Sequence, residues 1–330
     1  MDYGQGAASQ SASIIRNGKR KTVMNVIVLG AAGFIGTNLA LRLAQEKEKR
    51  VTLVDSKKEY FNSVLSHMNI VECDFALHTD FDKILAGQDV VYHLVSTITP
   101  ATSNLNIARD FMDNIVTTSK MLEACVKQKV KKVVFISSGG AVYGKNVISP
   151  IKEDDEQFPI TSYGIQKLTI EKTLHMLYEQ HGLDYRIVRL ANPYGPYQRP
   201  NGKLGVVTTF VYKCLNNEPV TLYGDGSVVR DFIYIDDAVD LIIKISQYDG
   251  SEKLFNLGSG KGTSIKEVIR DIEDVLGNSM YVQHENARNV DVPISYLNID
   301  RLKKAVGNYN FVPLKDGIQK TAEFLMKQHY

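Results

Sequence analysis

The stretch Val26–Gly36 (VIVLGAAGFIG) decides the fold of the chain. An apolar, β-branched run breaks into three glycines spaced G-x-x-G-x-x-G, and apolar residues at helical spacing continue from Leu39. This order predicts a strand, a tight turn and a helix. Glycines let the turn approach a pyrophosphate closely, and the start of a helix attracts its negative charge. We therefore expect a dinucleotide at Gly30, Gly33 and Gly36.

An acid at the end of the next strand supports this prediction. The run Arg50–Asp55 is typical of a strand, and Asp55 lies nineteen residues beyond Gly36. An acid about 20 residues after the last glycine is placed to hydrogen-bond a ribose 2′-hydroxyl. A glycine pattern alone is weak evidence, and a plain turn between strand and helix is the alternative. Because Asp55 repels a 2′-phosphate, NAD is predicted over NADP, although Lys57 and Lys58 follow it.

Composition excludes several classes of function. The 330 residues are 44% hydrophobic and carry a net charge of +2, with both signs interspersed. This length predicts roughly two domains with a large core. The charge gives no field that would select nucleic acid or a membrane surface, so we expect neither as a partner. Three cysteines without paired spacing and scattered histidines predict no structural metal and a cytoplasmic location.

The first 23 residues differ from the rest of the chain. They are mostly small and polar and end near the basic cluster Lys19–Lys21, with only Ile14-Ile15 as an apolar patch. A signal peptide needs a longer apolar run after its charges. We expect residues 1–23 to form a disordered extension, with Met24 as an alternative natural start.

Strands and helices alternate after Asp55. The expected strands are 70–74, 89–95 and 132–138, and the expected helices are 81–85, 106–129 and 161–178. This alternation predicts an α/β fold with a Rossmann-type, doubly wound parallel sheet. Ligands of such sheets bind at the carboxyl ends of the strands. The residues at those ends are Asp55, Asp74, Val95, Ser96, Ser137, Ser138, Asn192 and Pro193.

One helix carries a pair of residues that suits proton transfer. Tyr163 and Lys167 are four residues apart, so both side chains lie on one face. An ammonium beside a phenol favours the phenolate, which makes Tyr163 a candidate general base or acid near neutral pH. The alternative is a tyrosine and a lysine exposed on a helix surface.

Taken together, the motifs resemble the extended short-chain dehydrogenases/reductases, in particular the NAD-dependent sugar epimerase/dehydratase family typified by UDP-galactose 4-epimerase. The resemblance covers residues 24 to about 327. It is carried by Gly30-x-x-Gly33-x-x-Gly36, Asp74, Val142-Tyr143-Gly144, Tyr163-x-x-x-Lys167, Arg189–Pro196 and Gly224–Tyr234.

The resemblance implies roles for individual residues. Tyr163 is the base, and Lys167 holds the nicotinamide ribose and lowers the pKa of the phenol. NAD contacts are expected from Gly30, Gly33, Phe34, Ile35, Gly36, Asp55, Ser56, Asp74, Phe75, Leu94, Val95, Ser96, Asn114, Tyr163, Lys167 and Pro193. The diphosphate of a nucleotide sugar, expected to be a UDP-sugar, is bound by Asn192, Arg230, Arg288 and Asp291, and Ser295 lies beside the sugar.

The resemblance also implies a domain organisation. Residues 24–193 form the NAD-binding domain, to which 231–256 return, while 194–230 and 257–330 form the substrate domain. Homodimerisation is expected through the helices at 106–129 and 161–180.

The chain departs from the family at one catalytic position. The family has a serine or threonine four residues before the tyrosine of its V-Y-G motif, and here this position is Gly139. Either Ser138 or a water supplies the missing hydroxyl, or the chemistry differs. The leading hypothesis is a 4-epimerase of UDP-hexoses or UDP-N-acetylhexosamines. The alternatives are a 4-keto nucleotide-sugar reductase and a nucleotide-binding protein without activity; a dehydratase is less favoured, because Gly140 and Ala141 replace its acid pair.

Overall fold

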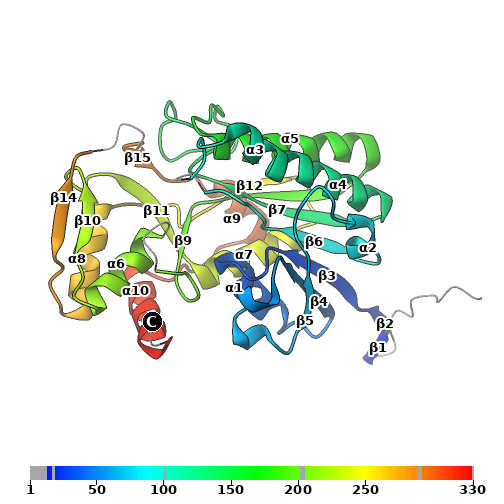
Figure 1. Ribbon diagram of the computed structural model, residues 1–330, viewed down its shortest axis with the longest axis horizontal. Helices are drawn as coiled ribbons and strands as arrows, with labels where there is room; N and C mark the ends of the chain where they lie inside the picture. Colours follow the sequence, from blue (N-terminus) through cyan, green and yellow to red (C-terminus); the bar gives the residue numbers. More distant parts are fainter. Residues whose placement is uncertain (1–12, 17–18, 100–101, 201–204, 288–291, 329–330) are drawn as a thin grey trace, which may run out of the picture.

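The computed structural model describes residues 13–16, 19–99, 102–200, 205–287 and 292–328. Its centre is a seven-stranded sheet in the order β12-β8-β7-β6-β3-β4-β5, in which all neighbours are parallel (Figure 1). Chain order reverses between β3 and β6, which confirms the predicted doubly wound fold. The strands are β3 (Met24–Leu29), β4 (Lys49–Asp55), β5 (Asn69–Glu72), β6 (Val90–His93), β7 (Lys132–Ser138), β8 (Asp184–Leu190) and β12 (Leu254–Leu257).

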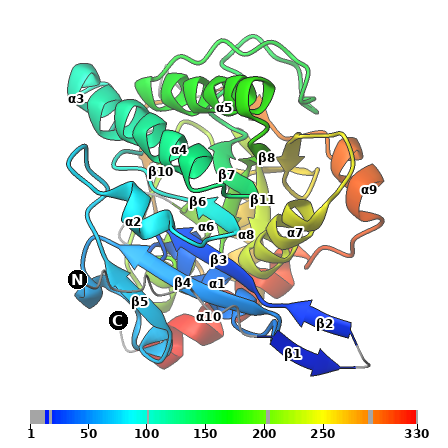
Figure 2. The same ribbon diagram turned by 90° about the vertical axis from the view of Figure 1, so that its right-hand side faces the viewer.

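Helices cover both faces of this sheet, as a fully buried parallel sheet requires. Successive residues of β3 show how the two faces are filled. Val26 and Val28 pack into one hydrophobic cluster, and Ile27 and Leu29 into the other. Figure 2 shows the two layers on either side of the sheet. The first contains α1 (Phe34–Leu43), α7 (Ile235–Gln247) and α9 (Asp300–Val306), and the second α2 (Phe81–Leu85), α4 (Thr117–Lys127) and α5 (Ser162–His181).

The helix expected over 106–129 forms with an irregular turn inside it. It consists of α3 (Ile107–Phe111), a π-helical segment η3 (Met112–Val116) and α4. Asn106 caps its start by accepting a hydrogen bond from the backbone N–H of Arg109 at 3.2 Å. Single π-helical turns occur frequently at functional sites, and this one contains Asn114.

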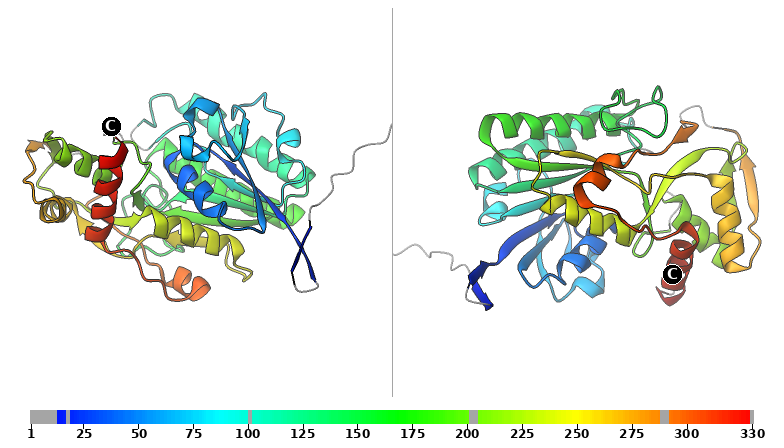
Figure 3. Two further views of the ribbon diagram at one scale, coloured as in Figure 1. Left: turned by 90° about the horizontal axis from the view of Figure 1, so that it is seen from below. Right: turned by 180° about the vertical axis from the view of Figure 1, so that it is seen from behind.

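A smaller lobe lies at one end of the molecule (Figure 3). Its strands are β9 (Asn192–Tyr194), β10 (Val220–Tyr223), β11 (Val229–Tyr234), β13 (Gly262–Ser264), β14 (Val282–Glu285) and β15 (Ile294–Ser295). Its helices are α6 (Val206–Leu215), α8 (Ile265–Leu276) and α10 (Leu314–Gln328), which enclose a separate hydrophobic core. This lobe contains most of the expected second domain.

The boundary between the two parts differs from the expected one at two places. Strand β11 belongs to the small sheet with β13 and β15, so the return to the main sheet begins with α7 and not at Asp231. In addition, α9 and the residues just before it pack with the main sheet instead of the lobe. Leu297 and Ile299, which precede α9, and Leu302 within it are buried in a hydrophobic cluster of the main sheet. Helix α9 contacts α7 and β12, so these apolar side chains are buried against the main sheet layer.

Part of the expected disordered extension is paired instead. Strands β1 (Ser13–Arg16) and β2 (Lys19–Thr22) form an antiparallel hairpin. The dipeptide Asn17-Gly18 stands between them in the sequence and is a strong hairpin signal, so a local pattern does account for this pairing. Two 3₁₀ turns, η1 (Lys58–Tyr60) and η2 (Ser63–Leu65), connect β4 to β5. Throughout the described ranges, every helix is too short or too polar to cross a membrane.

Candidate active site

The glycine turn after β3 has the geometry of an anion site. Gly30 adopts a φ of 84°, which L side chains rarely take, and a Cβ on Gly36 would lie 2.2 Å from the Gly30 carbonyl oxygen. Both positions therefore need glycine. Gly33 begins α1 without a side-chain cap, and the first turn of α1 contains no acid. The first N–H groups of this helix are thus available to a pyrophosphate.

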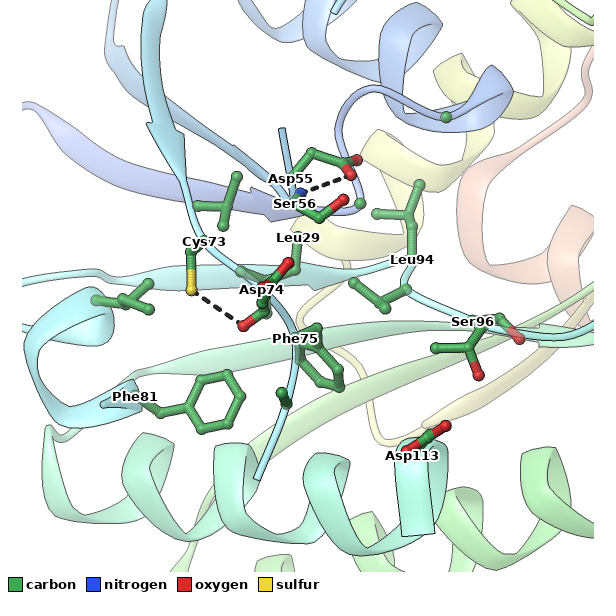
Figure 4. A pocket seen from close by; sticks show the side chains of 17 residues that line it. Leu29, Asp55, Ser56, Cys73, Asp74, Phe75, Phe81, Leu94, Ser96 and Asp113 are labelled. Carbon is green, nitrogen blue, oxygen red and sulfur yellow. Dashed lines mark hydrogen bonds between the residues drawn. The ribbon is translucent and has the colours of Figure 1, made fainter. Parts of the chain in front are cut away.

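A cavity of about 490 Å³ opens beside this turn, at the carboxyl ends of β3, β4 and β6 (Figure 4). This is the point at which strand order reverses, where doubly wound sheets bind their ligands. Nine of the predicted cofactor residues line it: Gly30, Gly33, Asp55, Ser56, Asp74, Phe75, Leu94, Val95 and Ser96.

Three carboxylates surround this cavity. Asp55 turns toward the glycine turn and accepts hydrogen bonds from the backbone N–H groups of Ala32, at 3.0 Å, and Ser56, at 2.8 Å. Asp74 and Asp113 belong to other elements that line the cavity, and Figure 4 shows Asp113 across from Asp55. Such a cavity suits hydroxyl and amino groups of a nucleoside and repels an additional phosphate.

The other predicted cofactor residues do not line this cavity. The side chains of Phe34 and Ile35 pack against the hydrophobic core, so only their backbone can face a ligand. Gly36 is buried behind the turn. The cavity is also lined by residues that the motifs do not predict: Leu29, Val54, Cys73, Ala76, Phe81, Ile84, Thr97 and Asp113. Several of these adjoin predicted residues, but Asp113 reaches the cavity from η3, and no local sequence pattern indicates its role.

Asn114 lies behind the cavity and fixes one of its loops. Its Oδ1 accepts from the backbone N–H of Thr97 at 2.9 Å, and its Nδ2 donates to the Thr97 hydroxyl at 2.8 Å and the Asp110 carbonyl at 2.9 Å. The side chain is 6% exposed. Its hydrogen bonds hold Ser96 and Thr97 at the end of β6, where they line the cavity.

The predicted proton-transfer pair lies next to the end of β7. Thr161 caps α5 by accepting from the Gly164 N–H at 3.1 Å, which fixes the first turn of the helix. The Ser138 side chain lies near enough to the Tyr163 hydroxyl to lower the pKa of the phenol. Lys167 Nζ donates to the Ile136 carbonyl oxygen at 2.9 Å and lies 5.6 Å from the centre of the Tyr163 ring. The structure thus brings all three predicted catalytic residues together.

Burial controls the ionisation of this pair. It raises the pKa of Tyr163 to about 12, and the hydrogen bond from Ser138 opposes this rise. Burial also lowers the pKa of Lys167 to about 8, against the charge of Glu171. The pKa of the Tyr163 phenol is therefore raised by desolvation and not lowered as expected, and the Lys167 ammonium donates to a backbone carbonyl instead of the phenol.

The packing around residue 139 explains why this position is a glycine, whereas the family has a serine or threonine there. A Cβ on Gly139 would lie 2.7 Å from Leu297 Cδ1 and 3.1 Å from the Arg189 carbonyl oxygen. The Gly139 N–H donates to the Leu190 carbonyl at 2.8 Å, which keeps this backbone close to β8. A side chain at this position would displace Leu297, and the nearest hydroxyl is that of Ser138.

Predicted substrate residues converge where β9, β11 and β15 meet. Asn192 Nδ2 donates to the Asp231 carbonyl at 2.9 Å, and Arg230 donates to the Val292 carbonyl at 2.6 Å. Ser295 is the direct strand partner of Arg230. Pro193, which is partly buried, pairs with Ile233. Arg288 and Asp291 lie outside the described residues.

The buried carboxylate of Asp231 connects the segments of this region by hydrogen bonds. It is 1% exposed and accepts hydrogen bonds from the backbone N–H groups of Ser259, at 2.8 Å, and Leu297, at 3.2 Å. Its carboxylate thereby ties β11 to the segment that carries Ser295. In the described part of the chain, no three His, Cys, Asp or Glu side chains are grouped in a way that could hold a metal ion.

Known proteins share the sequence pattern and the fold of this chain. The pattern of the NAD dependent epimerase/dehydratase family matches residues 26–258. The UDP-glucose 4-epimerase of Mycolicibacterium smegmatis is 33% identical over 91% of this chain and 98% of its own length. The dTDP-4-dehydro-6-deoxyglucose reductase of Escherichia coli is 31% identical over 89% of this chain and 95% of its own. The structure of Thermotoga maritima UDP-glucose 4-epimerase with UDP-glucose has a TM-score of 0.87 and 33% identity, and the match covers 93% of this chain and 100% of that chain.

Proposed function

The chain belongs to the NAD-dependent epimerase/dehydratase family, and from this premise we propose that it is a 4-epimerase of a UDP-hexose or UDP-N-acetylhexosamine. Its cofactor is NAD, and its relatives include NAD-dependent UDP-sugar epimerases, which are isomerases. The cavity fits this cofactor, since it combines an uncapped helix start for a pyrophosphate with carboxylates for ribose hydroxyls.

Each residue of the site has a distinct part in the proposed reaction. NAD, when bound, accepts a hydride from C4 of the sugar and returns it to the opposite face. Tyr163 takes the proton of the 4-hydroxyl and gives it back, and Ser138 hydrogen-bonds the oxygen that Tyr163 deprotonates. Asn192 and Arg230 hold the diphosphate, so that the sugar ring is free to rotate between the two transfers.

The grouping of Tyr163, Lys167 and Ser138 at the carboxyl end of β7, the strand next to β6, is the observation that carries this proposal. Its test is incubation with UDP-, GDP- and dTDP-sugars without added cofactor, followed by NMR. Interconversion of C4 epimers of a UDP-sugar is the expected result. If no sugar is converted, although the protein retains NAD and binds UDP, the proposal is wrong.

A 4-keto nucleotide-sugar reductase is the second candidate, favoured by the identity with the Escherichia coli reductase. It would use the same Tyr163 and Lys167 but exchange its cofactor in each turnover. NAD that remains bound through purification favours the epimerase, whereas consumption of added reduced cofactor with a 4-keto sugar favours the reductase. A nucleotide-binding protein without activity has no use for Tyr163 beside a buried Lys167.

We expect NAD to bind at least about tenfold more tightly than NADP, because an additional phosphate would meet the carboxylates of Asp55 and its neighbours at low effective dielectric. Calorimetry with both cofactors on stripped protein measures the ratio. The variant Asp55→Asn should reduce it, while Glu59→Gln, on the exposed η1 turn, should leave it unchanged. Equal affinities in the unmodified protein would count against this role of Asp55.

Ser295 is predicted to leave room for a 2-acetamido group, since it is small and lies beside Arg230. We expect turnover of both UDP-glucose and UDP-N-acetylglucosamine, because differences in apolar fit are worth only about 1–3 kcal/mol. Ser295→Tyr should suppress activity on the N-acetylated sugar and spare UDP-glucose. Equal losses on both sugars, or none, would show that Ser295 is a loop residue outside the sugar pocket.

We also propose a homodimer that forms through the surface of α3, η3 and α5. Four apolar side chains there are exposed by two-fifths or more: Ile107, Met112, Val116 and Ile165. Figure 2 shows these helices side by side on one outer face. An apolar patch of this kind on paired helices is typical of protein interfaces. A second copy of the chain would bury it.

Val116→Glu is expected to convert the dimer into a monomer, because a charge in the centre of an apolar interface loses its hydration. Light scattering after size-exclusion chromatography measures the mass. The control is Met326→Glu, at an apolar residue of α10 that is even more exposed and lies outside this surface. An unmodified chain that is already monomeric would refute the dimer.

A further inference from the structure

The buried face of α5 carries a third charged residue beyond Tyr163 and Lys167. Glu171 lies one turn after Lys167 and is 3% exposed. Its carboxylate receives three hydrogen bonds from the Arg189 guanidinium of β8, at 2.6, 3.1 and 3.2 Å. The Ser137 hydroxyl donates to Oε1 at 2.5 Å. The carboxylate is therefore satisfied in one fixed position at the end of β7.

Arg189 makes further contacts besides those with Glu171. Its Nη1 donates to the Glu153 carbonyl oxygen at 3.1 Å, and its guanidinium lies 4.8 Å from the centre of the Tyr143 ring. The Glu153 side chain, which is buried, accepts from the backbone N–H of Asn256 at 2.9 Å. Removal of one member of such a buried pair leaves an uncompensated charge, so the arrangement is sensitive to single substitutions.

Lys167 and Glu171 are four residues apart on α5, so their buried charges are neighbours on one face of the helix. Its ammonium is buried, and its other contacts are the Ile136 carbonyl and the Phe135 ring, 4.7 Å away, neither of which carries a full charge. Glu171 is the group whose charge raises the pKa of Lys167, against the burial that lowers it.

The remaining titratable groups around Lys167 do not provide a negative charge at neutral pH. His93, on β6, is neutral, because burial and the charge of Lys167 lower its pKa to about 3. Burial raises the pKa of Tyr163, on α5, to about 12, so its phenol is uncharged at rest. Arg189, on β8, is a cation. Charges therefore alternate from Lys167 through Glu171 to Arg189.

We propose that Glu171 is a positioning residue for the reaction, which keeps the Lys167 ammonium charged and directed at the Tyr163 side of the site. This inference rests on the proposed function of Tyr163 and Lys167. It adds Arg189 of β8 to the site on α5 and gives the buried ion pair of Glu171 and Arg189 a role in the reaction. The competing view is that the pair of Glu171 and Arg189 only stabilises the fold.

The test compares three variants of the NAD-bound protein. Glu171→Gln keeps the shape but leaves two buried cations, of which lysine releases its proton more readily. We expect the alkaline fall of kcat to move to lower pH by about 1 unit. Arg189→Met should move it in the opposite direction, since Glu171 then acts on Lys167 alone. Ser137→Ala keeps both charges and should leave its position unchanged.

A second measurement does not require turnover. The titration of the Lys167 ammonium can be followed directly by NMR of protein with labelled lysine, and the spectrum of Lys167→Met assigns its signal. Glu171→Gln should move this titration to lower pH, because Lys167 loses the nearby negative charge, and Arg189→Met should move it to higher pH. This readout separates the role of Glu171 from the identity of the substrate, so an absence of epimerisation does not decide it.

A fall in the amplitude of kcat or in thermal stability, without a shift of either pH profile, would show a purely structural role and overturn the proposal. If one single variant does not fold, the double variant Glu171→Gln with Arg189→Met removes both charges at once, which buried pairs often tolerate. In this double variant, the alkaline fall of kcat should lie between the pH values found for the unmodified protein and for Glu171→Gln. An alkaline fall at the same pH as in the unmodified protein would also overturn the proposal.

Discussion

Replacement of Tyr163 by phenylalanine is expected to lower turnover at least about 10²-fold, the lower end for loss of a general acid–base group. The phenylalanine keeps the ring over which Lys167 lies, so the packing of α5 is retained. What disappears is the hydroxyl near Ser138 that we propose takes the proton of the sugar. Steady-state kinetics with the UDP-sugar identified by NMR measures the loss.

Nucleotide affinity should remain nearly unchanged in this variant, because the proposed diphosphate contacts, Asn192 and Arg230, lie on β9 and β11. Calorimetry with UDP checks this. Tyr178→Phe is a matched control on the same helix, since the Tyr178 ring contacts Tyr185 and Lys253 away from the site. Turnover near that of the unmodified protein in Tyr163→Phe would remove Tyr163 from its role.

The second large effect is expected from Ser138→Ala, with a loss of about 10- to 100-fold in kcat. A hydrogen bond to a group that becomes charged contributes about 1.5–3 kcal/mol. The hydrogen bond from Ser138 also lowers the pKa of the Tyr163 phenol against its burial, so its removal should shift the acidic limb of kcat to higher pH. Ser138→Thr keeps the hydroxyl and should restore most of the activity. Unchanged turnover in Ser138→Ala would show that a water or another side chain serves the 4-hydroxyl.

The complementary change, Gly139→Ser, tests the usual family position. The family resemblance by itself favours an increase in activity, because the serine would restore the missing hydroxyl. The structure predicts the opposite, because the new Cβ would displace Leu297 at 2.7 Å and approach the Arg189 carbonyl. We expect a lower melting temperature and no gain in turnover. An increase in turnover would mean that Leu297 moves without cost and that position 139 accepts the catalytic hydroxyl.

Much of the cofactor site can be predicted from the sequence, because its signals are local. The strand, turn and helix around Gly30, Gly33 and Gly36 follow from residue types within a few positions of one another. Strand β7 has the predicted bounds, Lys132–Ser138, because β-branched and apolar residues favour a buried strand. Fixed helical spacing places Tyr163 and Lys167 on one face without knowledge of the fold.

Prediction from the sequence fails where a property depends on distant residues. The acidic run that begins at Glu153 is typical of a surface loop, yet Glu153 is buried under Arg189 and bonded to Asn256. Similarly, the expected domain organisation places α9 in the smaller lobe, although its apolar residues pack on α7 and β12. No local pattern distinguishes these residues from exposed ones.

The sequence by itself thus determined the alternation of strands and helices in the first half of the chain, the glycine turn and the shared helix face of Tyr163 and Lys167. Only the tertiary structure decided why position 139 is glycine, since Leu297 approaches it from far along the chain. The tertiary structure also decided the ionisation of Tyr163 and Lys167 and joined Glu171 to Arg189. Backbone preferences and periodicity arise between neighbours in sequence, whereas desolvation, steric exclusion and charge pairing depend on which distant segments fill the space around a side chain.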